Sequence, residues 1–330
     1  MILAGIDIGT NTLRLLVAET GPDVFHEVYA DRRITRLGQD LDRTGRLSSD
    51  AQERSLAALL EFSGQMRSRA VSHAAAIGTS ALRNASNSRA FIDEVEKRTG
   101  LAVRIVSGEE EARLTLLGVT QALRGCKGPG DGGARFALVI DIGGGSTEVI
   151  SSSSPKRGVA SLPLGAVYLT ERFIRHDPPS TTELEQMRHA IDVELGKLGA
   201  AAGRSQGILA GTAGTITTLA AIDQGLTAYE PGKINGYSLK REAVDRMIHT
   251  LVKTTLEERR LIPGLDPGRE DIILAGAVVA QEIMKRFGYD SMFVSDGGLR
   301  EGIVLDLYEK VAHGRSRPRK STEATKAGRR

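Results

Sequence analysis

The chain has 330 residues, 40% of them hydrophobic and 26% charged, which suffices for two folded domains with cores of their own. Cys126 is the single cysteine, which excludes an intrachain disulfide, and no apolar run reaches membrane-spanning length, so we expect a cytoplasmic protein. Residues 313–330 hold seven Lys or Arg against one Glu, a net charge of +6. Because the whole chain carries +3, the rest carries −3, and the pI near 9.0 reflects the tail.

The N-terminal residues 2–17 read ILAGIDIGTNTLRLLV, an apolar strand that runs into Asp7, Gly9 and small polar residues before a second apolar strand. This pattern predicts a hairpin whose turn carries no bulky side chain, so a ligand can approach its backbone. An ordinary Asp-Gly hairpin is the alternative interpretation if the turn is taken alone.

Strands and helices then alternate, which is typical of an α/β protein. A helix over residues 49–69 is indicated by Ser48 or Ser49 as its cap and by leucines at helical spacing. The other elements predicted here are a strand pair around 25–36, a strand over 74–77, a helix ending near Val95, a strand over 100–106 and a helix from 108 to about 123.

The last of these helices begins with three glutamates, Glu109, Glu110 and Glu111. Ser107 and Glu110 fit a capping box, and acidic residues in a first turn suit the helix dipole. Capping does not account for Glu111, which flanks the helix face that carries Leu114. A carboxylate on such a face is either buried at a cost or lines a cleft.

Residues 137–151, ALVIDIGGGSTEVIS, repeat the N-terminal pattern after a loop over 125–133. Asp141 superposes on Asp7, and the glycines after it leave backbone N–H groups open to phosphate oxygens. Asp141 and Glu148 also supply hard oxygen ligands of the kind that Mg²⁺ prefers. Two such hairpins predict a duplicated fold in which each half presents one phosphate-binding turn to a shared cleft.

The remaining residues continue the α/β alternation. The elements predicted are a strand over 159–162, a helix over 182–198, a strand and a helix joined by the turn GTAGT over 207–221, helical residues 238–260, a helix over 271–286, a strand near 292–294 and a helix over 299–311. Residues 313–330 lack large apolar side chains, so this stretch is expected to be disordered.

Seven segments together resemble the exopolyphosphatase and guanosine pentaphosphate phosphohydrolase (Ppx/GppA) family, within the superfamily of sugar kinases, actin and heat-shock chaperone ATPases. They are DIGTNTLRLL at Asp7, GTSALRNA at Gly78, GEEEARL at Gly108, DIGGGSTEV at Asp141, LPLGAVYLTERF at Leu162, GTAGTITTLAA at Gly211 and SDGGLREGI at Ser295. The resemblance spans nearly the whole chain up to about residue 310. It implies two duplicated actin-like, sugar kinase-like (ribonuclease H-like) α/β domains flanking a cleft. Domain I would be 1–125 with helix 299–312 packed back on it, domain II 126–298, and the basic tail 313–330.

The resemblance also implies roles for individual residues. Glu111 would be the general base that deprotonates a water, and Asp141 and Glu148 would be catalytic residues that hold Mg²⁺ or Mn²⁺. Stimulation by K⁺ is a further expectation. Arg14 and Arg83 would neutralise phosphate charge, with surface ion pairs as the alternative interpretation. The phosphate-binding candidates are Asp7, Asn11, Thr12, Arg14, Arg83, Gly143, Gly144, Gly145, Ser146, Thr147, Gly211 and Thr212.

The activity implied by the resemblance is removal of terminal orthophosphate from inorganic polyphosphate. One rival has the same chemistry on guanosine pentaphosphate, the stringent-response nucleotide. A rival of another class is an ATP-binding actin-like switch or a kinase, against which the carboxylate at Glu111 argues. We expect a homodimer without membrane or nucleic-acid partners, and a basic tail that could concentrate a polyanionic substrate in a salt-dependent way.

Overall fold

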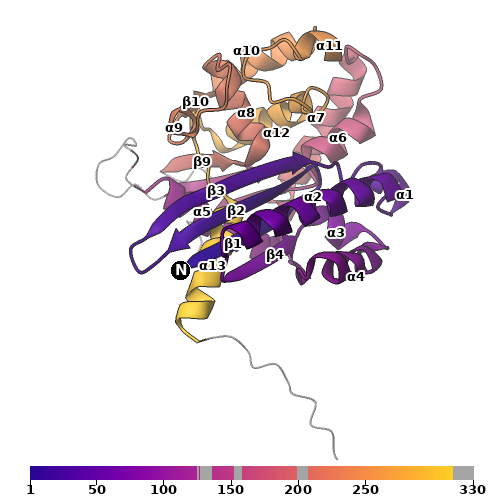
Figure 1. Ribbon diagram of the computed structural model, residues 1–330. Helices are drawn as coiled ribbons and strands as arrows, with labels where there is room; N and C mark the ends of the chain where they lie inside the picture. The colour runs from indigo at the N-terminus through magenta and orange to yellow at the C-terminus, as the bar shows by residue number, and fades with distance from the viewer. Residues whose placement is uncertain (125, 127–135, 152–157, 199–206, 315–330) are drawn as a thin grey trace, which may run out of the picture.

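The computed structural model describes residues 1–124, 126, 136–151, 158–198 and 207–314. These residues form two lobes, each built on one mixed β-sheet with helices packed on it (Figure 1). The first sheet has the order β3-β2-β1-β4-β5 and the second the order β10-β11-β9-β6-β7-β8.

The first sheet is formed by β1 (Ile2–Ile8), β2 (Thr12–Thr20), β3 (Phe25–Ile34), β4 (His73–Gly78) and β5 (Val103–Ile105). Its helices are α1 (Leu41–Thr44), α2 (Ser49–Ser68), α3 (Ser80–Asn84) and α4 (Ser88–Thr99). Ser48 caps α2 by accepting a hydrogen bond from the N–H of Ala51, as the cap prediction requires. Leu59 and Phe62 of α2 are buried in the core of this lobe.

The second sheet is formed by β6 (Phe136–Ile142), β7 (Thr147–Ser151), β8 (Val159–Leu162), β9 (Ile208–Thr212), β10 (Ser238–Lys240) and β11 (Ser291–Val294). Its helices are α6 (Ala166–Phe173), α7 (Thr181–Gly196), α8 (Ala213–Asp223), α9 (Pro231–Ile234), α10 (Arg241–Leu251), α11 (Leu256–Arg259) and α12 (Ile273–Phe287). Twelve of the fifteen residues of helix α12 are buried, and the helix runs through the core of this lobe.

The two sheets repeat one pattern of strand pairing. In the first, β1 pairs antiparallel with β2 and parallel with β4; in the second, β6 pairs antiparallel with β7 and parallel with β9. The duplicated α/β fold expected from the two hairpins is therefore confirmed, because equivalent strands occupy equivalent places in the two sheets.

Two helices cross between the halves of the chain. Helix α5 (Gly108–Ala122) comes from the first half but places Ala112 and Val119 in a cluster with residues of the second sheet. Helix α13 (Leu299–Ala312) follows the second half but lies beside β1 (Figure 1). Its Val304 belongs to the same hydrophobic cluster as Leu3 of β1. The two helices also pack on each other, so each lobe is covered by a helix from the other half.

Two of the predicted elements are wrong. Residues 25–34 form one strand, β3, whose partner is β2, rather than a strand pair of their own. Residues 238–240 form a strand rather than the start of a helix, because they pair with β11 and bury Leu239; this tertiary pairing outweighs local helix propensity. Within the described parts of the chain, no helix has the length and apolarity needed to cross a bilayer. The predicted tail covers residues 313–330, and its residues 315–330 lie outside the described residues.

Candidate active site

The two hairpins have the same turn. In the first, the N–H of Gly9 donates to the carbonyl of Thr12 at 3.2 Å; in the second, the N–H of Gly143 donates to the carbonyl of Ser146 at 3.0 Å. A turn of this kind closes the strands of a hairpin while the small residues at its tip keep the backbone accessible. The superposition drawn from the sequence is thus matched by hydrogen bonding.

The tips of the two hairpins lie against each other, and glycine permits this approach. A Cβ on Gly144 would lie 3.2 Å from the backbone nitrogen of Asn11, and a Cβ on Gly145 would lie 2.6 Å from the hydroxyls of Ser80 and Thr10. A side chain at Gly145 would therefore displace the side chains of Ser80 and Thr10.

The N-terminus of helix α6 holds the turn of the second hairpin in place through hydrogen bonds. The N–H groups of Ala166 and Val167, in the first turn of the helix, donate to the carbonyls of Gly143 and Gly144, both at 2.9 Å. These bonds satisfy N–H groups that a helix start would otherwise leave without partners. The bonds also occupy the carbonyl oxygens of the turn. A carbonyl oxygen left free there would repel a phosphate.

A cleft lies where the two turns meet. It is lined by residues from both lobes and from α5. The polar side chains that line it are those of Asp7, Thr10, Asn11, Thr12, Arg14, Thr79, Ser80, Glu111, Asp141, Ser146, Thr215 and Arg269. The site candidates Gly143, Gly144 and Gly145 line it as well. The structure thus brings together in one cleft most of the residues that the sequence singled out.

Glu111 lies in this cleft on the first turn of α5, with 6% of its surface exposed. Its Oε2 accepts a hydrogen bond from Arg83 Nη1 at 3.0 Å, and the same nitrogen donates to the carbonyl of Val106 at 2.8 Å. Burial raises the pKa of Glu111 well above its usual range, the Glu148 carboxylate raises it further, and Arg83 opposes both. A carboxyl with a raised pKa suits a proton acceptor that works near neutral pH.

Three further carboxyls are buried beside it. Burial raises the pKa of Asp7 to about 7 although Arg14 lowers it, and burial together with Asp141 raises the pKa of Glu148 to about 7. Burial likewise raises the pKa of Asp141. Glu148 accepts a hydrogen bond from Ser161 at 2.7 Å, and Asp141 accepts one from Thr115 at 3.2 Å. The site therefore holds more negative charge than its own cations offset.

The same region contains oxygen acceptors without donors. Asp7 Oδ1 and Asn11 Oδ1 are buried and have no hydrogen-bond partner. A divalent cation fits these observations, since hard oxygen atoms and uncompensated carboxylates are what Mg²⁺ binds. Among the described residues no group of three His, Cys, Asp or Glu side chains is arranged to hold a metal ion.

Some predicted site residues lie behind the cleft rather than on it. Thr147 is fully buried and donates to the carbonyl of Leu164 at 2.8 Å, and Thr212 donates to the carbonyl of Gly297 at 2.9 Å. After Gly211 and Thr212, the cleft is instead lined by the next residues, Ala213 to Thr215. Glu148 and Arg83 do not line the cleft either. Glu148 accepts a hydrogen bond from Ser161, and Arg83 donates one to Glu111.

Arg269 lines the cleft, although no sequence motif pointed to it. Its side chain is buried, its Nε donates to Asp266 Oδ2 at 3.0 Å, and burial with the nearby Arg14 lowers its pKa to about 10. The guanidinium packs on Gly214, where a Cβ would come within 2.6 Å of Nη1. Thr79 and Ser80 were also missed as individual residues, although they fall within the GTSALRNA segment.

Arg14 lies at the junction of two cavities. It lines the cleft and also a neighbouring cavity bordered by Arg32, Tyr229 and Arg300. Its charge lowers the pKa of both Asp7 and Asp141, yet within the described ranges no ion-pair or hydrogen-bond partner holds its guanidinium. A cation in that position is free to bind an anion that enters from either cavity.

Comparisons with known proteins establish the family of this chain. The model of the Ppx/GppA phosphatase family matches residues 16–311, and the chain belongs to that family. It is 32% identical to the Mycobacterium tuberculosis protein named Exopolyphosphatase 2 over 319 residues, which cover 92% of this chain and 98% of that protein.

Two solved structures of similar proteins have the same fold over nearly their whole length. One is described as an exopolyphosphatase-like protein, with 33% identity, a TM-score of 0.87, and coverage of 94% of this chain and 98% of that one. The other is the Aquifex aeolicus member of the Ppx/GppA family, with 32% identity, a TM-score of 0.78, and coverage of 95% and 99%. The family resemblance and fold class expected from the sequence are confirmed.

Proposed function

We propose that the protein is an exopolyphosphatase, which hydrolyses the terminal phosphoanhydride bond of inorganic polyphosphate and releases orthophosphate. The observation that carries the proposal is the placement of Glu111, a buried carboxylate in a cleft whose other walls are two phosphate-binding turns. The similarity to proteins named exopolyphosphatase supports it.

The terminal phosphate would bind between the two turns. Backbone N–H groups at Gly144 and Gly145 and the hydroxyl of Thr12 are donors at the cleft wall, whereas the Ser146 hydroxyl hydrogen-bonds to Glu148. Arg14 and Arg269 would add two positive charges from opposite lobes. Donors fixed in place before the substrate arrives stabilise the charge that develops on phosphoryl oxygens during transfer.

Glu111 would act as the general base. It takes a proton from a water as the water oxygen bonds to the terminal phosphorus, while the bond to the bridging oxygen breaks and its electrons stay on the shortened polyphosphate. Arg83 touches Glu111 rather than the cleft, so we assign it the role of orienting the carboxylate. This modifies the expectation that Arg83 binds phosphate.

Asp141 and Glu148 remain the residues proposed to hold Mg²⁺ or Mn²⁺, and Asp7, with its unpartnered oxygen, lies close enough for the Asp141 charge to raise its pKa. A bound divalent cation would supply positive charge that offsets the charge of the phosphate oxygens. Stimulation by K⁺, a homodimeric state and a cytoplasmic location are further proposals carried over from the sequence.

The test of the substrate is a parallel assay on long-chain polyphosphate and guanosine pentaphosphate with Mg²⁺ present. We expect orthophosphate release from polyphosphate with the larger kcat/KM. A larger value for guanosine pentaphosphate would instead assign the protein to the stringent response. Tight ATP binding without turnover of either substrate would favour an ATP-binding switch and overturn the proposal.

A further inference from the structure

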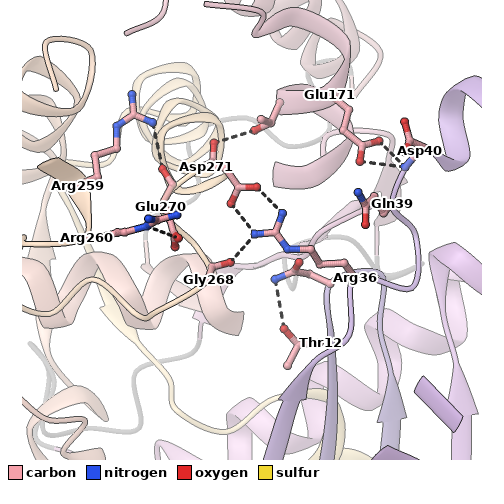
Figure 2. A network of polar contacts seen from close by, with 12 residues as sticks. Thr12, Arg36, Gln39, Asp40, Glu171, Arg259, Arg260, Gly268, Glu270 and Asp271 are labelled. Atoms are coloured by element: carbon pink, nitrogen blue, oxygen red, sulfur yellow. Dashed lines mark hydrogen bonds and ion pairs between the residues drawn. The ribbon is translucent and has the colours of Figure 1, made fainter. Parts of the chain in front are cut away.

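Two arginines at the end of β3 reach across to one segment of the other lobe. Arg32 donates to both oxygens of Asp266, at 2.5 and 2.6 Å. Arg36 donates to both oxygens of Asp271, at 2.6 and 3.1 Å, and to the carbonyl of Gly268 at 3.2 Å (Figure 2). Paired N–H···O bonds of this kind fix the relative orientation of the two groups as well as their distance.

The segment held by these arginines carries Arg269, which lines the cleft. Asp266 is shared: it accepts from Arg32 across the lobes and from Arg269 Nε at 3.0 Å within its own lobe. The bridge at Asp271 holds the other end of the same segment. The position of the Arg269 guanidinium in the cleft is thus tied to contacts with the opposite lobe.

Residues next to β3 also contact the turn of the first hairpin, residues 9–12, which we call the first phosphate turn. The N–H of Arg36 donates to the carbonyl of Asn11 at 2.9 Å, and the N–H of Gly38 donates to the carbonyl of Thr10 at 2.9 Å. Arg36 has a φ of 50°, a left-handed conformation that costs a non-glycine residue energy and that persists where surrounding contacts impose it. Arg36 therefore joins the backbone of the first turn directly to the segment of Arg269.

The ion pairs of Arg32 and Arg36 are side-chain contacts between the lobes. Helices α5 and α13 instead contact each other through their backbones. A Cβ on Gly302 would lie 2.6 Å from the carbonyl carbon of Leu114, so these helices cannot separate without losing close packing. The arginine side chains, by contrast, are 45% and 36% exposed and their partners Asp266 and Asp271 are 12% and 25% exposed, so these ion pairs border water and can open without disturbing helix packing. A further hydrogen bond across the lobes, from the N–H of Asp40 to Glu171 at 3.0 Å, is partly buried.

We propose that Arg32, Arg36, Asp266 and Asp271 form an interlobe latch, and that closing it positions Arg269 opposite the first phosphate turn. The role of the latch in hydrolysis rests on the function proposed above, whereas its role in holding the lobes together does not. With the latch open, Asp266, the ion-pair partner of Arg269, is no longer held by the opposite lobe, so the position of the Arg269 guanidinium is less fixed. The four residues are positioning residues, since none of them needs to touch the reacting phosphate.

The test measures the separation of the lobes directly. Spin labels are placed at Arg89→Cys on α4 and Val193→Cys on α7, sites that are 83% and 49% exposed, in a Cys126→Ser background. Pulsed electron resonance then gives the distance distribution between the lobes. We expect Arg32→Gln combined with Arg36→Gln to lengthen or broaden the distribution, and high salt to shift the parent protein the same way.

The matched control is Arg260→Gln. Arg260 pairs with Glu270 at 3.1 Å in the same segment, but both residues belong to one lobe (Figure 2). This variant should keep the parent distribution. The exchange of Arg36→Asp with Asp271→Arg should restore it relative to Arg36→Asp alone, because Asp271 has Arg36 as its ion-pair partner.

Activity gives the second readout. Opening the latch should lower kcat/KM on polyphosphate by about 10- to 100-fold, since small displacements of positioning groups have effects of that size, while the control stays within about twofold. An unchanged distance distribution in the double variant would overturn the latch. A changed distribution in a protein that hydrolyses no polyphosphate would leave the latch standing and reject the proposed function instead.

Discussion

The crossing of α5 and α13 leads to a prediction about Gly118. A Cβ added there would overlap the carbonyl oxygen of Gly298 and lie 2.7 Å from its carbon and 3.0 Å from the nitrogen of Gly302. All three are backbone atoms, which cannot rotate away as a side chain can. The helices would have to part by roughly 1 Å, and overpacking against backbone costs about 3 kcal/mol. We therefore expect Gly118→Ala to lower the free energy of unfolding by about that amount.

The same displacement should reach the active site. Glu111 lies two turns before Gly118 on α5, so a shift of the helix moves the proposed base, and a displacement near 1 Å costs about 100-fold in rate. Urea unfolding measures the first effect and orthophosphate release the second. Gly64→Ala is the control, because a Cβ at Gly64 in α2 meets no atom within 4 Å and should stabilise the helix by about 0.5–1 kcal/mol. Equal stability of Gly118→Ala and the parent would refute the reasoning.

Two further predictions concern carboxylates. Asp141→Asn should raise the Mg²⁺ concentration needed for half-maximal activity, because a charged ligand is lost; a metal dependence like that of the parent would exclude Asp141 from the metal site. Burial raises the pKa of Glu183, but hydrogen bonds from Ser180, His176 and Arg175 outweigh it and set this pKa at about 2. Ionised Glu183 therefore stabilises the folded protein. This stabilisation is full above the pKa that Glu183 has in the unfolded chain, and it is lost as the pH falls towards 2. Glu183→Gln should cost about 1–2 kcal/mol at pH 7, a difference that disappears near pH 2 in pH-dependent unfolding.

The duplicated fold could be predicted from the sequence because its signal is local. An apolar strand, an aspartate and a glycine turn occur twice, at Asp7 and Asp141, and each turn closes with the same hydrogen bond. Glu111 could be singled out for a related reason, since the predicted capping box uses Glu110 and leaves a second carboxylate beside an apolar helix face. In the structure Ser107 caps the helix, but the Glu110 carboxylate pairs with Arg104 and does not close a capping box. The structure places the Glu111 carboxylate in the cleft.

Residues that reach the cleft from distant segments could not be predicted in this way. Arg269 sits in a polar turn with no periodicity, and its place depends on Asp266 and on the absence of a side chain at Gly214. Thr212 was predicted to bind phosphate but does not line the cleft. It belongs to a recognisable turn, but its hydroxyl donates to the carbonyl of Gly297, and the first residue of this turn that lines the cleft is Ala213. Neither fact is encoded in local pattern, because both depend on which segments the fold brings together.

The most direct test of the proposed function is orthophosphate release from long-chain polyphosphate by Glu111→Gln. The amide keeps the shape of the side chain but cannot accept the proton of a water, so we predict a loss in kcat of about 10²- to 10⁴-fold. Glu110→Gln is the matched control: its carboxylate pairs with Arg104 at 2.7 Å, away from the cleft, and kcat should stay within about twofold of the parent. A kcat for Glu111→Gln equal to that of the parent would contradict the assignment of Glu111 as the general base.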